Sequence, residues 1–139
     1  MIQVICPVCG AALEPQGTAW RCAQGHCFDV ARQGYVNLLT VTQKHSRHPG
    51  DTREMVAARR AFLDAGWYAP IAKTLADLVR RFCPEAASVL DAGCGEGYYT
   101  AEMAKTLRER EYRPKVAGID ISKAALQEAV MHRLFRWRI

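Results

Sequence analysis

The 139-residue sequence predicts an α/β protein made of a small metal-binding N-terminal module and an incomplete Rossmann-like domain. Two observations lead to this fold class. Cysteine and histidine residues are closely spaced near the N-terminus, and a short apolar stretch farther along runs directly into a glycine-rich loop and then a helical pattern. Half of the residues are hydrophobic and 24% are charged, which is typical of a globular chain rather than a disordered one.

Residues 1–40 form the predicted N-terminal module. Cys6 and Cys9 make a C-x2-C pair, and Cys22 and His26 follow at a spacing that completes C-x2-C-x12-C-x3-H. This spacing is a strong zinc signature, because two thiolates on a tight turn can hold one side of a tetrahedral ion. A module of about 40 residues has too small a core to fold without such a staple. We therefore expect a structural zinc, with a short hairpin between the two ligand pairs.

The fourth zinc ligand is open at this point. Cys27 stands directly beside His26 and would be the softer, anionic ligand. With either residue, four protein ligands close the site, which leaves no position for water or substrate and argues against a catalytic metal.

Residues 41–50 are predicted to be a basic linker or loop. The net charge of the chain is +5, and this stretch carries basic and histidine side chains without apolar residues between them: Lys44, His45, Arg47 and His48. Such a stretch is either a solvated loop or a contact for phosphate groups. The sequence does not separate the two.

Two helices are expected after the linker. Asp51 or Thr52 can cap the first helix, which should end near Asp64, and Pro70 suits the first turn of a second helix that ends near Cys83. Apolar residues at helical spacing mark a candidate buried face on each. These residues are Met55, Ala58, Phe62 and Leu63 in the first helix and Ile71, Leu75, Leu78, Val79 and Phe82 in the second.

A strand, a glycine loop and a helix are predicted next. Residues 88–91 are of strand type, residues 98–109 are helical, and between them Asp91 precedes Gly93, Gly95 and Gly97 in a D-x-G-x-G-x-G pattern. Glycines let a ligand approach the backbone closely, and the helix start offers N–H groups. A dinucleotide fold would show G-x-G-x-x-G, and an acidic residue at the strand end repels phosphate. The pattern favours a cationic nucleoside ligand, namely S-adenosylmethionine.

A second strand over residues 115–120 is predicted to end in another acid. Asp120 follows an apolar run and is placed to accept hydrogen bonds from the two hydroxyls of the cofactor ribose. Ser122 can cap the helix that follows. Two acids at neighbouring strand ends strengthen the interpretation of the glycine loop as a cofactor site.

These motifs, taken in order, resemble a known family. The zinc pattern, "GYVNLL", "KHSRHPGD", "RRAFLDAGWY" and "VLDAGCGEGYYT" are similar to the bacterial RlmA-like 23S rRNA guanine-N1-methyltransferases. The resemblance implies a zinc module that helps to recognise an rRNA hairpin, attached to a Rossmann-like methyltransferase domain. It implies Cys6, Cys9, Cys22 and His26 as zinc ligands, and it implies cofactor contacts from Tyr68, Gly93, Gly95, Glu96, Gly97 and Asp120.

The methyltransferase part, residues 51–139, is expected to be truncated after its second strand, and the sequence identifies no catalytic base. We expect the chain to bind zinc, to bind S-adenosylmethionine weakly and not to turn over alone. One alternative is an RNA-binding zinc module with a non-catalytic methyltransferase remnant. Another is a methyltransferase of small molecules. No apolar run or signal sequence suggests a membrane, so a cytoplasmic location is expected, with a homodimer left open.

Overall fold

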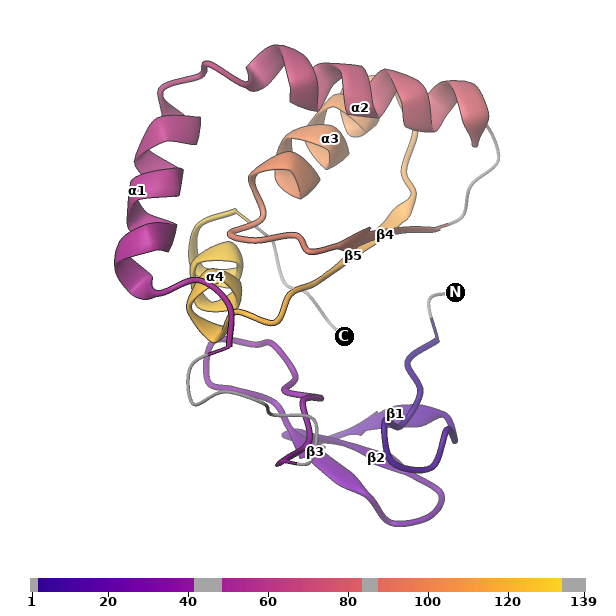
Figure 1. Cartoon of the computed structure of the whole chain (residues 1–139). Helices are drawn as coiled ribbons and strands as arrows, with labels where there is room; N and C mark the ends of the chain where they lie inside the picture. Colours follow the sequence, from indigo (N-terminus) through magenta and orange to yellow (C-terminus); the bar gives the residue numbers. More distant parts are fainter. Residues whose placement is uncertain (1–2, 42–48, 84–87, 134–139) are drawn as a thin grey trace.

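The structure is a computed structural model, and it describes residues 3–41, 49–83 and 88–133. Figure 1 shows two parts: a small β-sheet near the N-terminus, and above it a layered part made of helices over two strands. The polypeptide passes from one part to the other through the region of the predicted basic linker. Most of residues 41–50, including Lys44, His45, Arg47 and His48, lie outside the described residues.

The N-terminal sheet has three antiparallel strands. Strands β1 (Leu13–Gln16) and β2 (Ala19–Cys22) form the predicted hairpin, and β3 (Cys27–Asp29) pairs with the other edge of β2. Gly17 occupies the hairpin turn with a φ of +63°, a backbone region that L-residues with a side chain rarely adopt. Buried Cys6, Leu13 and Cys22 form its only core cluster among the described residues, which is a small core for a free-standing sheet.

Two helices connect this sheet to the rest of the chain. Helix α1 (Arg53–Asp64) begins where Thr52 Oγ1 accepts a hydrogen bond from the Met55 N–H, as the capping pattern predicted. Helix α2 (Ala69–Phe82) has a proline in its first turn, where a missing N–H costs nothing.

The remaining elements form a β-α-β unit. Parallel strands β4 (Ser88–Ala92) and β5 (Lys115–Ile119) flank helix α3 (Tyr98–Glu109) in sequence, and Val89 is paired with Val116. Helix α4 (Lys123–Glu128) follows and continues into one π-helical turn, η2 (Ala129–Arg133). In Figure 1, α3 lies between α2 and the two strands. This arrangement is the opening of a Rossmann-like sheet, and the described residues contribute two strands to it.

The core of this part is formed by small and aliphatic residues between α2, α3 and the sheet. Leu107 and Ala76 are completely buried, and Val89 and Val116 pack against the same cluster. The alanines of α2 allow the two helix backbones to approach closely.

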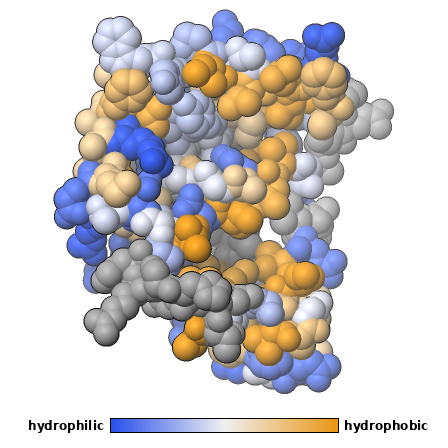
Figure 2. Space-filling model, viewed as in Figure 1, coloured by the Kyte–Doolittle hydropathy of each residue, from blue (hydrophilic) through white to orange (hydrophobic). Residues whose placement is uncertain are grey.

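The predicted apolar faces of α1 and α2 were largely wrong. Helix α1 buries Val56 and Leu63, whereas the other predicted residues of its face, Met55, Ala58 and Phe62, are exposed. Helix α2 buries Ala72 and Ala76 against α3. The larger apolar side chains of α2 are exposed: Ile71, Leu75, Leu78 and Phe82. Figure 2 shows hydrophobic side chains along the upper part of the molecule, where Figure 1 places α2.

No helix within the described ranges has the length and hydrophobicity needed to cross a bilayer.

The packing of α2 on α3 predicts unequal effects of the same leucine truncation at two positions. Leu107→Ala should lower the free energy of unfolding by about 2–5 kcal/mol, because it leaves a cavity in the cluster. Leu78→Ala, at a residue that is 42% exposed, should cost about 1 kcal/mol or less. Urea unfolding followed by circular dichroism measures both; equal losses would contradict this packing.

Candidate metal centre and cofactor site

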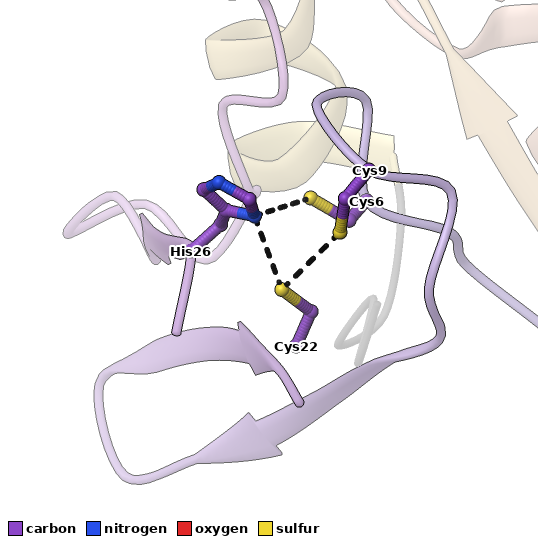
Figure 3. A group of neighbouring side chains, drawn as sticks. All are labelled: Cys6, Cys9, Cys22 and His26. Carbon is purple, nitrogen blue, oxygen red and sulfur yellow. Dashed lines mark hydrogen bonds between the residues drawn. The ribbon is translucent and has the colours of Figure 1, made fainter. Parts of the chain in front are cut away.

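Four side chains converge at the open end of the N-terminal sheet. Figure 3 shows Cys6, Cys9, Cys22 and His26 pointing toward one another, with Cys22 at the end of β2, and their ligand atoms all lie within 4.8 Å of each other. His26 Nδ1 is 3.6 Å from Cys6 Sγ and 3.4 Å from Cys22 Sγ, and the Sγ atoms of Cys9 and Cys22 are 3.7 Å apart.

Tight backbone turns place these ligands. The Cys6 N–H donates to the Ala11 carbonyl and the Gly10 N–H donates to the Cys6 carbonyl, both at 2.8 Å, which folds the first pair into a knuckle. The second turn is closed by the Gly25 N–H, which donates to the Cys22 carbonyl at 3.0 Å.

Burial alone would raise the pKa of the Cys6 thiol. Hydrogen bonds from the backbone of Val8 and Cys9 oppose this effect, and the pKa is held below its ordinary value. A thiol that loses its proton readily suits a metal ligand.

The four ligands fit a tetrahedral zinc ion. With Zn–S bonds of about 2.3 Å and a Zn–N bond of about 2.0–2.1 Å, tetrahedral geometry separates two sulfurs by about 3.8 Å and a sulfur from a nitrogen by about 3.6 Å. The distances above match these separations. Cys27 is exposed on β3 and does not belong to this group of side chains, so the geometry favours His26 as the fourth ligand.

The glycine loop folds back over the end of β5. The N–H groups of Gly93 and Cys94 donate to the Ile119 carbonyl at 2.8 and 3.0 Å, which holds the loop at the carboxyl ends of the two strands. Gly97 caps α3 with a φ of +81°, where a side chain would strain the backbone. The predicted Gly93, Gly95 and Gly97 therefore lie at the strand ends, where α/β folds bind their ligands.

The two predicted carboxylates border this loop. Asp120 Oδ2 accepts the Gly95 N–H at 2.8 Å, and Asp120 Oδ1 accepts the Ser122 N–H at 2.7 Å. The carboxylate of Asp91 accepts a hydrogen bond from the Thr100 hydroxyl.

The pKa of Cys94, inside the loop, reflects the negative charge of its surroundings. Burial raises the pKa of Cys94 to about 12, helped by the negative charges of Asp91 and Asp120. The thiol therefore stays neutral, and the site carries negative charge that favours a cationic ligand.

The other two predicted cofactor residues are Glu96, within the loop, and Tyr68, at the start of α2. Glu96 is 2% exposed, which makes it a buried part of the loop. Tyr68 caps α2, packs edge-on against Phe62 at 5.2 Å and is partly exposed. Burial raises the pKa of Tyr99 at the start of α3, and the nearby Tyr68 phenol raises it further. Tyr68 therefore lies near Tyr99 in the helix that follows the glycine loop, although the two residues are 31 positions apart in sequence.

A cleft of about 1110 Å³ opens next to Asp120. One wall is the end of the N-terminal module, including Tyr35 and Leu38, and the other includes Gly93, Asp120 and Ile121. Sequence reasoning did not foresee that residues 35–39 and 41 would line this cleft, because no local pattern encodes contacts between separate segments.

Two family models match the chain in the same order as these sites. The zinc-ribbon model described as "RlmA, N-terminal" matches residues 4–47, and a model described as "Methyltransferase domain" matches residues 85–133. A zinc-ribbon match and the four-ligand group agree on a structural zinc. The methyltransferase match agrees with the glycine loop and indicates S-adenosylmethionine as the cofactor.

Curated relatives align over 89% of the chain. It is 43% identical to the 23S rRNA (guanine(748)-N(1))-methyltransferase of Streptomyces fradiae, covering 42% of that protein. It is 40% identical to a putative 23S rRNA (guanine-N(1)-)-methyltransferase of Micromonospora griseorubida, covering 46%, and 33% identical to one of Bacillus subtilis (strain 168), covering 44%. The chain thus spans less than half the length of these relatives. On these matches, the chain carries an RlmA-type zinc ribbon followed by a methyltransferase domain, and it is similar to 23S rRNA guanine-N1-methyltransferases over 89% of its length.

Proposed function

We propose that this chain provides the zinc module and the first half of the cofactor site for methyl transfer from S-adenosylmethionine to N1 of a guanine in 23S rRNA. One observation carries the proposal. A tetrahedral Cys/His group and a glycine loop bordered by Asp91 and Asp120 stand on one chain, in the order found in relatives that are named for this reaction.

The zinc module is assigned to residues 1–40, the linker to 41–50 and the methyltransferase part to 51–139. Zinc would be held by Cys6, Cys9, Cys22 and His26. Its role is structural, because these four ligands complete a tetrahedron and the core of the module is small.

The cofactor would bind across the ends of β4 and β5. Asp120 is placed to accept the ribose hydroxyls, since each of its oxygens has further acceptor capacity beyond one backbone N–H. Asp91 would compensate the positive charge of the methionine part of the cofactor. Gly93, Gly95 and Gly97 would let the cofactor lie close to the loop backbone. Tyr68 would contact the cofactor from the side. Glu96, which is 2% exposed, would contact the cofactor as part of the same loop.

Methyl transfer to guanine N1 sets two further requirements. N1 carries a proton at neutral pH, so the reaction needs a group that removes it or stabilises the deprotonated base. N1 is also hidden in a base pair, so the target guanine must be unpaired or flipped out. We propose an rRNA hairpin as the target, a cytoplasmic site of action and a homodimer as an assembly to be tested.

Replacing each candidate fourth ligand tests the zinc assignment. His26→Ala should lower bound zinc from about one ion per chain to near zero and unfold the N-terminal sheet, because three ligands and a small core cannot hold the module. Cys27→Ala should keep its zinc. Elemental analysis after gel filtration measures both, and the opposite pattern would assign the ligand to Cys27.

Removing the strand-end carboxylate tests the cofactor site. Asp120→Ala should weaken the binding of S-adenosylhomocysteine about tenfold or more, since charged hydrogen bonds to the ribose would be lost. Asp29→Ala, at an exposed aspartate of β3, is the matched control. Calorimetric titration, with the mass in solution recorded alongside, gives the affinity, and equal affinities of the two variants would argue against this role.

A chimera tests the reaction itself. This chain would replace the matching segment of the Streptomyces fradiae relative, and the product would be incubated with S-adenosylmethionine and 23S rRNA. We expect methylation at guanine N1, seen as a reverse-transcriptase stop because an N1 methyl group blocks pairing. The chimera that carries Asp120→Ala should not methylate the rRNA. The 139-residue chain alone should also show no methylation.

Outcomes of the chimera experiment separate the candidate functions. A folded but inactive chimera that still binds rRNA in a salt-dependent manner would support the alternative, an RNA-binding zinc module with a non-catalytic methyltransferase remnant.

A further inference from the structure

The end of the linker packs directly on the turn between β5 and α4. Ser122, which is 2% exposed, donates its hydroxyl hydrogen to the Asp51 carbonyl at 2.8 Å. A Cβ atom built on Gly50 would lie 2.7–2.8 Å from the Cα, Cβ and N atoms of Ser122, so only glycine fits there. The last residue of the linker, Gly50, and the residue after it, Asp51, are therefore in van der Waals and hydrogen-bond contact with Ser122.

Ser122 in turn fixes the proposed ribose carboxylate. Its backbone N–H donates to Asp120 Oδ1 at 2.7 Å, while its Oγ accepts the Ala125 N–H at 3.1 Å and starts α4. The other oxygen of Asp120 accepts the Gly95 N–H of the glycine loop at 2.8 Å. A displacement of Ser122 must therefore move a group that holds Asp120.

Arg59 pairs with Asp51 and lies beside the glycine loop. Its Nη1 lies 2.7 Å from Asp51 Oδ2, and it is 3.8 Å from the position that a Cβ atom on Gly95 would take. The hydrogen bonds run from Asp51 through Ser122 and Asp120 to the Gly95 N–H of the glycine loop. These contacts connect residues 50–51 to two segments that are far away in sequence, the glycine loop and residues 120–122.

We propose that Gly50 and Asp51 position the carboxylate of Asp120 through Ser122, so that cofactor affinity depends on where the linker from the zinc module is docked. This inference rests on the proposed role of Asp120 in binding the ribose. Ser122 and Gly50 are positioning residues: they touch the group that would bind the cofactor and not the cofactor itself.

The physical reason is the narrow geometry of the ribose contact. A carboxylate that receives two hydroxyl hydrogen bonds must lie within hydrogen-bond distance of both, and small displacements weaken such bonds steeply. Two backbone N–H donors already fix both oxygens of Asp120, which pre-organises the group before a ligand arrives. Undocking the linker would remove part of that organisation, and an RNA that engages the linker could thereby change cofactor affinity.

The test uses the full chain with Gly50→Ala, and Gly17→Ala is the matched control. Both glycines have positive φ, at +80° and +63°, but a Cβ at Gly17 would meet nothing within 4 Å. The first measurement is the amide resonances of Gly95 and Ser122 in ¹H–¹⁵N spectra. Gly50→Ala should shift both, because both amides bond to Asp120, and Gly17→Ala should shift neither. If these two amide resonances are unchanged in Gly50→Ala, the proposal is overturned, whether or not the chain binds the cofactor.

The second measurement compares S-adenosylhomocysteine with its 2′-deoxyribose analogue. Gly50→Ala, and independently Ser122→Ala, should weaken binding of the first about tenfold and of the analogue much less, because the change acts through the ribose contact. Equal losses for both ligands would overturn the proposal, since they would indicate general damage to the loop. If the unmodified chain binds neither ligand, the proposed cofactor role fails, and the amide shifts alone decide whether the linker positions Asp120.

Discussion

The junction at Asp120 is the interaction on which the cofactor region depends. The two parallel strands that the structure describes give little rigidity on their own to the loops at their ends. The glycine loop is fixed instead by backbone bonds to the end of β5 and by the carboxylate of Asp120. The same carboxylate orders the turn into α4 through Ser122. The side chain of Asp120 thus fixes both the glycine loop and the turn into α4.

The N-terminal module depends in the same way on a few polar groups. Its buried cluster consists of Cys6, Leu13 and Cys22, so two of the three core residues are also candidate zinc ligands. Metal binding and core formation are therefore one event in this module. Because the module and its trailing segment line the cleft beside Asp120, loss of its fold would also remove one wall of that cleft.

The sequence predicted local features well and contacts between segments poorly. Thr52, Gly97 and Ser122 each stand where a helix begins, because capping and positive φ are set by neighbouring residues. Strand β3 was missed because three residues carry too short a pattern. The buried faces of α1 and α2 were largely wrong because helical spacing identifies an apolar stripe but not the element that covers it. Helix α2 carries two such stripes, and the alanine stripe is the one that packs on α3.

Charge explains why this loop suits a sulfonium cofactor rather than a dinucleotide. Asp91 and Asp120 both act on Cys94, so two negative charges lie close together at the strand ends. A pyrophosphate would add further negative charge there, whereas the ammonium and sulfonium groups of S-adenosylmethionine would relieve the repulsion. Neutral Cys94 lies close to both carboxylates without adding charge, and its Sγ would lie 2.8 Å from a Cβ on Gly118. Gly118 on β5 therefore keeps the room that this charge arrangement requires.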